Sequence, residues 1–251
     1  MALFSADQSR SENNLILAAL SPQDSAALTA KCTDVSLPRK TVVHHSGDPI
    51  THVYLPGGGF FSELAELRSG EMIEVMTVGR EGIAGAIAML SDGPVHTTSM
   101  VQGEITACLR LPVADFLAEM SRQPPFATLV RRYVKAWLEL TAQSTACNAL
   151  HPAEQRLARW LLMAHDRMAS DEFLLTQEFA AVMLGVSRPT VTIVAGILQK
   201  AGIVVYRHGR IRILNRQALE SAACECYRVS ISMLQEVFQT AQHRQEEMFD
   251  V

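Results

Sequence analysis

The chain has 251 residues, of which 48% are hydrophobic and 19% charged, and its formal net charge is −4 at pH 7. This composition is typical of a globular protein with one large or two ordinary domains, and no repeat or low-complexity tract is present. The polar segment Met1–Asn14 and the short apolar run near Ile83–Leu90 predict a cytoplasmic protein without secretory signal or membrane span. The five cysteines are odd in number and scattered, which argues against a disulfide framework: Cys32, Cys108, Cys147, Cys224 and Cys226.

Short strands are predicted for the first half of the chain. A helix precedes them, because Ser21-Pro22-Gln23-Asp24 reads as an N-cap, a first-turn proline and a first-turn acid; it should end near Lys31. From Val35 to Leu111, short apolar runs alternate with turn-forming residues, a pattern that indicates an antiparallel β-sandwich or barrel. The clearest runs are Thr41–His44, His52–Leu55, Phe60–Leu64, Met72–Val78 and Ile105–Leu111.

Helical patterning returns near Val113, and a long helix is predicted after Pro124-Pro125. Its apolar positions have an alternating spacing of four and three residues: Phe126, Val130, Tyr133, Trp137, Leu140, Ser144 and Cys147. This a/d spacing fits a helix that packs on its own domain, and it also fits a two-stranded coiled coil between two copies of the chain.

A second domain is predicted after Asn148–Pro152, which breaks the long helix and forms a hinge. Its expected elements are helices over Ala153–Ala169, Gln177–Leu184 and Arg188–Ala201, and strands over Val204–Arg207 and Arg210–Leu214. The two strands should form a hairpin closed by the two-residue turn His208-Gly209. Ala218–Met248 reads as a polar helical extension.

The segment LGVSRPTV, residues 184–191, joins two of these helices at a sharp corner. Thr176 can cap the first helix, and Gly185 can adopt the left-handed conformation at its end. Ser187 can cap the next helix, where Pro189 is tolerated because first-turn amides have no intrahelical partner. These features predict a helix-turn-helix.

The helix over Arg188–Ala201 has two distinct faces. At 100° per residue, one face gathers Val191, Val194, Ala195 and Leu198, and this face should be buried. The opposite face carries Pro189, Thr192, Ile193, Gly196 and Lys200, with Arg188 at its edge. Such a helix can lie in the major groove of DNA with its first turn at the base edges.

Charge supports a nucleic-acid partner despite the negative total. Ser187–Arg216 contains six Arg or Lys and no Asp or Glu, which makes a local basic surface. Arg188 could bond guanine or a phosphate and Thr192 could touch thymine methyls, whereas the hairpin arginines should hold the backbone. The candidate DNA-binding residues are Gln177, Ser187, Arg188, Pro189, Thr190, Thr192, Ile193, Lys200, Arg207, Arg210 and Arg212.

The segment LTQEFAAVMLGVSRPTVTIVAGILQKAGIV and its basic hairpin resemble the winged helix of the Crp/Fnr family of bacterial transcription regulators. The order of the upstream elements is similar over nearly the whole chain, and CNALHPAEQRLARWLLMAHDR (147–167) and CECYR (224–228) resemble one proteobacterial branch. The resemblance implies an α+β fold with a jelly-roll-like β-roll sensor, a dimerisation helix and a winged helix-turn-helix. It places Arg188 and Pro189 at base-contacting positions. Ile193 replaces an arginine of cyclic-AMP-responsive members, so the DNA sequence that is read should differ.

The resemblance implies four segments and a partner set. The segments are a sensor over 15–112, a dimerisation helix and hinge over 113–150, a DNA-binding domain over 151–216 and an extension over 217–251. Because reading a pseudo-palindromic operator needs two-fold symmetry, we favour the coiled-coil dimer. Its expected dimerisation residues are Phe126, Val130, Tyr133, Trp137, Leu140 and Ser144. The expected partners are double-stranded DNA, a second copy, RNA polymerase and a small-molecule effector, without a membrane.

The effector differs from a cyclic nucleotide in this interpretation. Members that bind cyclic nucleotides use a Gly-Glu pair for the ribose and a nearby arginine for the phosphate. Here Gly85 is followed by Ala86, and no arginine lies between Arg80 and Arg110. The expected effector pocket includes Gly85, Ala86, Thr97 and Thr98, and no cofactor is predicted.

Other functions are weakly supported. Cys224-x-Cys226 could be half a metal site, but no second cysteine pair exists, so a structural role without metal is favoured. His44-His45 invites a cupin-like metalloenzyme, but neighbouring strand residues point to opposite faces. A haem or redox sensor of the same family remains an alternative, with a ligand from His44, His45, His52 or His96. No nucleophile–base pair or phosphate loop stands out, so no enzymatic activity is predicted.

Overall fold

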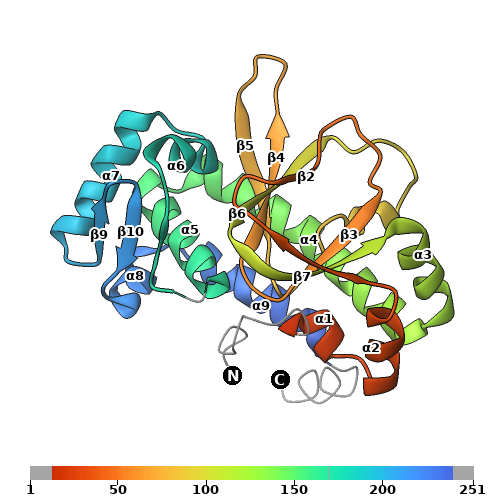
Figure 1. Ribbon diagram of the computed structural model, residues 1–251. Coiled ribbons are helices and arrows are strands. Elements are labelled where there is room, and N and C mark those ends of the chain that lie inside the picture. The colour runs from red at the N-terminus through yellow and green to blue at the C-terminus, as the bar shows by residue number, and fades with distance from the viewer. Residues whose placement is uncertain (1–12, 169, 240–251) are drawn as a thin grey trace.

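The computed structural model describes residues 13–168 and 170–239, and its first half is built from two antiparallel sheets (Figure 1). One sheet has the strand order β1-β7-β3 and the other β2-β6-β4-β5. The strands are β1 (Thr33–Leu37), β2 (Val42–His44), β3 (His52–Pro56), β4 (Phe60–Glu66), β5 (Met72–Val78), β6 (Thr97–Gly103) and β7 (Ile105–Pro112). This β-roll confirms the predicted antiparallel fold.

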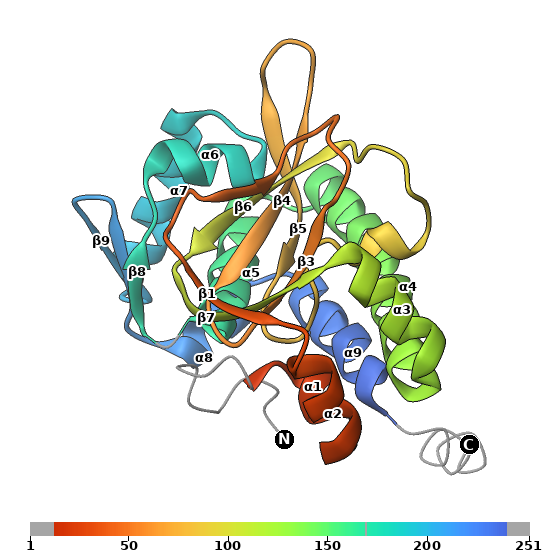
Figure 2. The same cartoon turned by 45° about the vertical axis from the view of Figure 1, so that its right-hand side comes forward.

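Helices flank the β-roll at both ends of its sequence. Two short helices precede it, α1 (Leu15–Ala18) and α2 (Pro22–Thr29), and the turn η2 (Ala86–Met89) follows β5. After β7 come α3 (Val113–Arg122) and the long α4 (Pro124–Leu150). The last described helix, α9 (Cys226–Phe238), lies beside α4, as Figure 2 shows.

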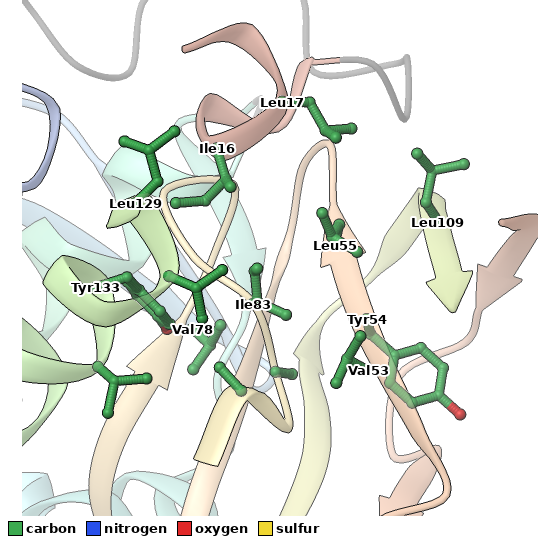
Figure 3. Packing of buried hydrophobic residues seen from close by; sticks show 14 of the residues in the cluster. Ile16, Leu17, Val53, Tyr54, Leu55, Val78, Ile83, Leu109, Leu129 and Tyr133 are labelled. Atoms are coloured by element: carbon green, nitrogen blue, oxygen red, sulfur yellow. The ribbon is translucent and has the colours of Figure 1, made fainter. Parts of the chain in front are cut away.

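The core of the roll includes the inner face of α4. Tyr133 of α4 projects towards Val78 (Figure 3), and Leu129, Tyr133, Val78 and Ile83 all belong to one apolar cluster. The close approach of α4 to the segment after β5 depends on Gly82, because a Cβ there would lie 2.3 Å from the Tyr133 ring. The long helix is therefore part of the sensor core.

This packing shows that the coiled-coil assignment of the apolar seam was wrong. Phe126, Val130 and Tyr133 are 0% exposed and Leu140 is 3% exposed within a single chain. Trp137 packs on the same core, and Ser144 is half-buried. A side chain already buried in its own protomer has no surface to offer a partner, so the 4-3 spacing reflects packing on the roll and on α9.

The second half forms a three-stranded sheet and four helices. Its elements are α5 (Ala153–Arg167), β8 (Glu172–Leu174), α6 (Gln177–Leu184), α7 (Arg188–Lys200), β9 (Val204–Arg207), β10 (Arg210–Ile213) and α8 (Arg216–Ala222). The sheet order β8-β10-β9 adds one strand to the predicted hairpin. The predicted helix over Ala218–Met248 is divided into α8 and α9, and its residues 240–248 lie outside the described part.

No single helix within residues 13–168 and 170–239 is long and apolar enough to cross a membrane. The pair α6 and α7 passes the same length and composition test only when joined, and its two helices are bent by 99°.

Candidate nucleic-acid interface and sensor cavity

The corner between α6 and α7 has the geometry of a helix-turn-helix. The two helices meet at 99°, within the usual range for this motif. Thr176 caps α6 by accepting a hydrogen bond from the Phe179 amide, and Ser187 caps α7 by accepting one from the Thr190 amide. Gly185 closes α6 with φ of 59°, a left-handed conformation that glycine adopts without steric cost.

The α7 helix buries the face that its periodicity predicts. Its buried residues are Val191, Val194, Ala195 and Leu198. The other face is open: Ile193 is 66% exposed, and Pro189 and Thr192 are also exposed. A Cβ at Gly196 would meet nothing within 4 Å, so packing within this chain does not require glycine there.

The predicted DNA-binding residues lie on this face, on the adjoining corner and on the hairpin. Ser187, Arg188 and Lys200 are exposed on or beside α7, and Gln177 and Thr190 are half-buried. The turn His208-Gly209 has φ of 51° and 72°, which matches the predicted two-residue hairpin turn. Arg207 and Arg210 are paired across the strands on either side of it.

Two acids that the sequence pattern did not single out hold these arginines. Arg188 Nη1 lies 3.1 Å from Glu178 Oε1. Arg210 Nε and Arg212 Nη2 each lie 2.6 Å from a carboxylate oxygen of Glu172. Hydrogen bonds from Arg210 and then Arg212 lower the pKa of Glu172. Glu172 therefore keeps its charge and orients both side chains of the hairpin.

One basic residue of Ser187–Arg216, Arg216, does not contribute to the exposed basic surface. Arg216 donates hydrogen bonds to Asp166 and Glu220 and lies over the Tyr227 ring. Because these partners belong to α5, α8 and α9, Arg216 stabilises the packing of the second domain. The basic surface accordingly contains Arg188, Lys200 and the three hairpin arginines.

A small cavity lies between the roll and α4. Three residues of the expected effector pocket line it, Gly85, Ala86 and Thr97, together with His44, Glu63, Val78, Ile83, Ile87, Tyr133, Val134 and Trp137. The volume available to a water-sized molecule is ≈ 20 Å³. Thr98 does not line it, because neighbouring strand residues face opposite ways and the Thr98 hydroxyl accepts a hydrogen bond from the Ser46 amide.

An acidic side chain, Glu63, lines this cavity beside His44. Glu63 is 4% exposed and accepts hydrogen bonds from Ser99 at 2.6 Å and from Thr97 at 3.3 Å. His44 Nε2 lies 3.6 Å from Glu63 Oε2, whereas His45 is exposed. The side chains of the two histidines thus point apart, as is expected of neighbouring residues in an extended segment.

A larger hollow adjoins the cavity and has a volume of ≈ 590 Å³. It shares Ile87, Thr97 and Trp137 with the cavity, and its remaining lining comes mainly from the loop of residues 88–96. Most of this lining is apolar, and Asp92 and His96 are the titratable groups among the lining residues. The size suits a small organic ligand.

The sensor half and the DNA-binding half share a buried contact. Arg167 of α5 forms a salt bridge of 2.6 Å with Glu81, and both side chains are at most 1% exposed. Trp160 of α5 donates a hydrogen bond of 2.7 Å to Glu74 of β5. Burial raises the pKa of Glu74 to about 7, against the lowering effect of hydrogen bonds from Ser62 and Trp160.

This shift predicts that stability depends on pH through Glu74. The folded state holds the Glu74 proton more tightly than the unfolded state does, because the pKa of this carboxyl is 4.5 in the unfolded chain. The stabilisation is therefore fully present below about pH 4.5 and is lost as pH rises to about 7, by about 3 kcal/mol at most. Urea unfolding should show a flatter pH profile for Glu74→Gln, whereas Glu66→Gln, at an exposed position, should match the wild type. Identical profiles for wild type and Glu74→Gln would contradict the shift.

The β-roll, the long helix and the winged helix-turn-helix define a DNA-binding regulator with an attached sensor. The model of the Crp-like helix-turn-helix domain matches residues 155–222, and that of the cyclic nucleotide-binding domain matches residues 34–123. The chain belongs to the Crp/Fnr family of transcription regulators, as its winged-helix motif suggested. No curated protein matches it.

Solved structures with a similar fold come from several bacteria. FixK2 from Bradyrhizobium japonicum is 18% identical, with 77% of this chain and 98% of that chain covered and a TM-score of 0.63. The c-di-GMP responsive global regulator CLP of Xanthomonas campestris is 16% identical, with 77% and 99% covered and a TM-score of 0.60. A regulator of the CRP/FNR family from Thermus thermophilus is 18% identical, with 76% and 98% covered and a TM-score of 0.58. These likenesses show the fold.

Proposed function

We propose that two copies of this chain bind a pseudo-palindromic DNA operator in the cytoplasm and act on RNA polymerase there, in response to a small molecule. The observation that carries this proposal is the open face of α7. Its first turn presents Arg188 and Pro189 at the exposed end of the helix, while the opposite face is fully packed. A helix anchored in this way can enter a major groove with its N-terminal residues at base edges.

The proposed site divides into base-reading and phosphate-holding parts. Arg188, Pro189, Thr192 and Ile193 on α7 read bases, with Thr190 beside them. Gln177, Ser187 and Lys200 contact the flanking phosphates, and so do Arg207, Arg210 and Arg212 of the hairpin. The proposed units remain 15–112 for sensing, 113–150 for dimerisation and hinge, 151–216 for DNA and 217–251 for the extension.

The proposed dimer interface is the outer face of α4. Seven residues with 3-4 spacing form this outer face, and each is exposed: Thr128, Arg131, Lys135, Leu138, Ala142, Thr145 and Ala149. From Leu138 onward, this face carries one large apolar side chain among small residues. Such a surface allows two helices to approach closely about a two-fold axis.

The proposed effector site is the hollow beside η2. Its ≈ 590 Å³ and its apolar lining suit a small, largely apolar molecule. Because Ile87, Thr97 and Trp137 line both the hollow and the smaller cavity against α4, a ligand there would contact the dimerisation helix directly.

Selection of bound sequences from a random DNA pool tests the proposal. An inverted repeat with half-sites about 34 Å apart is expected. Arg188→Ala should cost about 1–3 kcal/mol on the selected operator and much less on random DNA, because it removes a base contact. Arg210→Ala should weaken both DNAs alike and reduce the salt dependence by about one counterion, because it removes a phosphate contact.

Arg68→Ala, on the exposed β4–β5 hairpin, is the control and should bind as the wild type does. Equal and negligible effects of Arg188→Ala and Arg210→Ala would refute the assignment of α7 as the recognition helix. A selected site without an inverted repeat would refute the symmetric dimer.

A further inference from the structure

Four side chains with metal-ligating atoms converge behind the hinge. Cys147 lies in the last turn of α4, and His151 directly follows that helix. Cys224 and Cys226 lie at the junction of α8 and α9. The ligand atoms of all four lie within 4.8 Å of one another, and the three cysteines are buried. Cys224-x-Cys226 alone could supply only two ligands of a metal site, and in the fold Cys147 and His151 supply the other two.

The distances fit a single tetrahedral ion. Cys147 Sγ lies 3.5 Å from Cys224 Sγ, and Cys226 Sγ lies 3.6 Å from His151 Nδ1. With Zn–S of about 2.3 Å and Zn–N of about 2.0–2.1 Å, neighbouring ligand atoms of a tetrahedral zinc lie roughly 3.5–3.8 Å apart. Two of the six donor–donor distances therefore match those around one tetrahedral zinc ion, and the other four are at most 4.8 Å, so small shifts of the side chains suffice to bring all four donors onto one ion.

Groups around the four donors orient them as in known zinc sites. His151 turns Nδ1 to Cys226 and Nε2 to Glu225, whose Oε1 lies 3.2 Å away. A carboxylate on the second nitrogen is the usual partner of a zinc-bound histidine. Gln143 Nε2 donates a hydrogen bond of 3.1 Å to Cys226 Sγ, which would stabilise a thiolate.

Charge at the cluster is also compatible with a metal. Three thiolates, a neutral histidine and Zn²⁺ carry a net charge of −1. Arg159 is 7% exposed and close enough to Cys147 to act on it electrostatically. A buried cation beside a site of net negative charge reduces the cost of burying either charge alone.

We propose that Cys147, His151, Cys224 and Cys226 bind one structural Zn²⁺ ion that joins the end of α4 to the start of α9. On binding, the three thiols lose their protons to solvent, and three Zn–S bonds and one Zn–N bond form without a change of oxidation state. The site is closed, with four protein ligands, as structural zinc sites are. It fixes the hinge from which the DNA-binding half begins.

A disulfide and an iron–sulfur cluster are two other roles for these cysteines, and each accounts for the positions of the four donor atoms less well than one zinc ion does. A disulfide between Cys147 and Cys224 would leave His151 directed at an unused Cys226. An iron–sulfur cluster binds its ligands through several irons, which places the ligand atoms farther apart than one ion does. The close mutual approach of all four donors favours a mononuclear site.

Metal analysis of the full-length protein, purified under reducing conditions from zinc-containing medium, tests the proposal. One zinc per chain is expected. After removal of zinc, titration with Co²⁺ should give the visible d–d bands of a tetrahedral site and an ultraviolet thiolate-to-cobalt charge-transfer band. Zinc should then abolish both. Absence of zinc together with absence of the cobalt bands would overturn the proposal, and so would iron accompanied by sulfide.

Variants assign the ligands. Cys224→Ser and His151→Gln should each lose bound zinc and the tetrahedral cobalt spectrum, whereas Cys32→Ser, far from the cluster in sequence, should keep both. Glu225→Gln should retain the spectrum but weaken metal affinity about 10–100-fold, because it loosens His151 without removing a ligand. Loss of the spectrum in Cys32→Ser, or its survival in Cys224→Ser, would overturn the ligand set. The wild-type cobalt titration decides the question even if a ligand variant fails to fold.

Discussion

Replacing Leu138 by glutamate is expected to separate the two protomers of the proposed dimer. Leu138 is 52% exposed in the single chain and lies at the middle of the outer face of α4. In a symmetric dimer, each copy of this helix contacts the same face of the other. The substitution would bury two unpaired carboxylates at one point, and burying an unpaired charge is costly. The fold of each chain should tolerate the change, because the Leu138 side chain is not part of the core of the roll.

Affinity for the operator should fall when the dimer dissociates. Two linked reading heads bind an operator more tightly than one head by an effective-concentration factor of about 10²–10⁴. The Leu138→Glu protein should lose about this factor on the full operator but bind an isolated half-site nearly as the wild type does. Sedimentation and binding titrations on both DNAs measure the two effects.

Leu67→Glu is the matched control for this variant. Leu67 is 60% exposed in the turn of the β4–β5 hairpin and belongs to a different element from the outer face of α4. It should leave both the dimer and operator binding intact. An undiminished dimer in Leu138→Glu would show that another surface holds the protomers together.

Cyclic AMP and cyclic GMP are expected not to bind, even though the roll matches the cyclic nucleotide-binding domain model. A cyclic phosphate buried in a β-roll needs a fixed cation. The cavity beside Gly85 and Ala86 is lined instead by Glu63, and its lining contains no Arg or Lys. Its ≈ 20 Å³ also leaves room for little more than a water molecule. Repulsion and lack of space therefore act together against the nucleotide.

The expected loss is at least about three decades of affinity relative to a site with a cation and a ribose carboxylate. Calorimetry with both nucleotides, run beside an operator-binding assay, checks it. Glu63→Gln is a useful second protein: it removes the repelling charge but supplies no cation, so it should not bind either. Micromolar binding by the wild type that raises operator affinity would mean that the roll uses a different pocket.

Local signals in the sequence were sufficient to predict the helix-turn-helix. The caps at Thr176 and Ser187, the left-handed Gly185 and the buried face of α7 each depend on neighbours within one or two turns. The strand β6 was missed because its buried residues include Thr98, Ser99 and Gln102, so no apolar alternation marks it. β1 and β8 were missed as well.

Long-range partners could not be predicted from the sequence pattern. A 4-3 apolar spacing shows which side of a helix is buried but not what buries it. The sheet and α9 that cover Phe126, Val130 and Tyr133 come from distant segments, so the seam was assigned to a second copy. Cys147 and Cys224 lie 77 residues apart, and only folding places them together. The hydrogen bond from Ser99 to Glu63 and the pairing of Glu172 with the hairpin arginines likewise join segments that lie far apart in the sequence.

The buried contact between the two halves limits how they can be exchanged among relatives. Phe60 and Leu64 of the roll belong to the apolar core of the DNA-binding half, and Gly79 leaves the space that Arg167 occupies, since a Cβ there would lie 2.7 Å from its side chain. Replacing the DNA-binding half by one without an arginine at the position of Arg167 would leave the Glu81 carboxylate buried without its cation. The two halves must therefore be inherited together or altered in step on both sides of this contact, although each has its own family model.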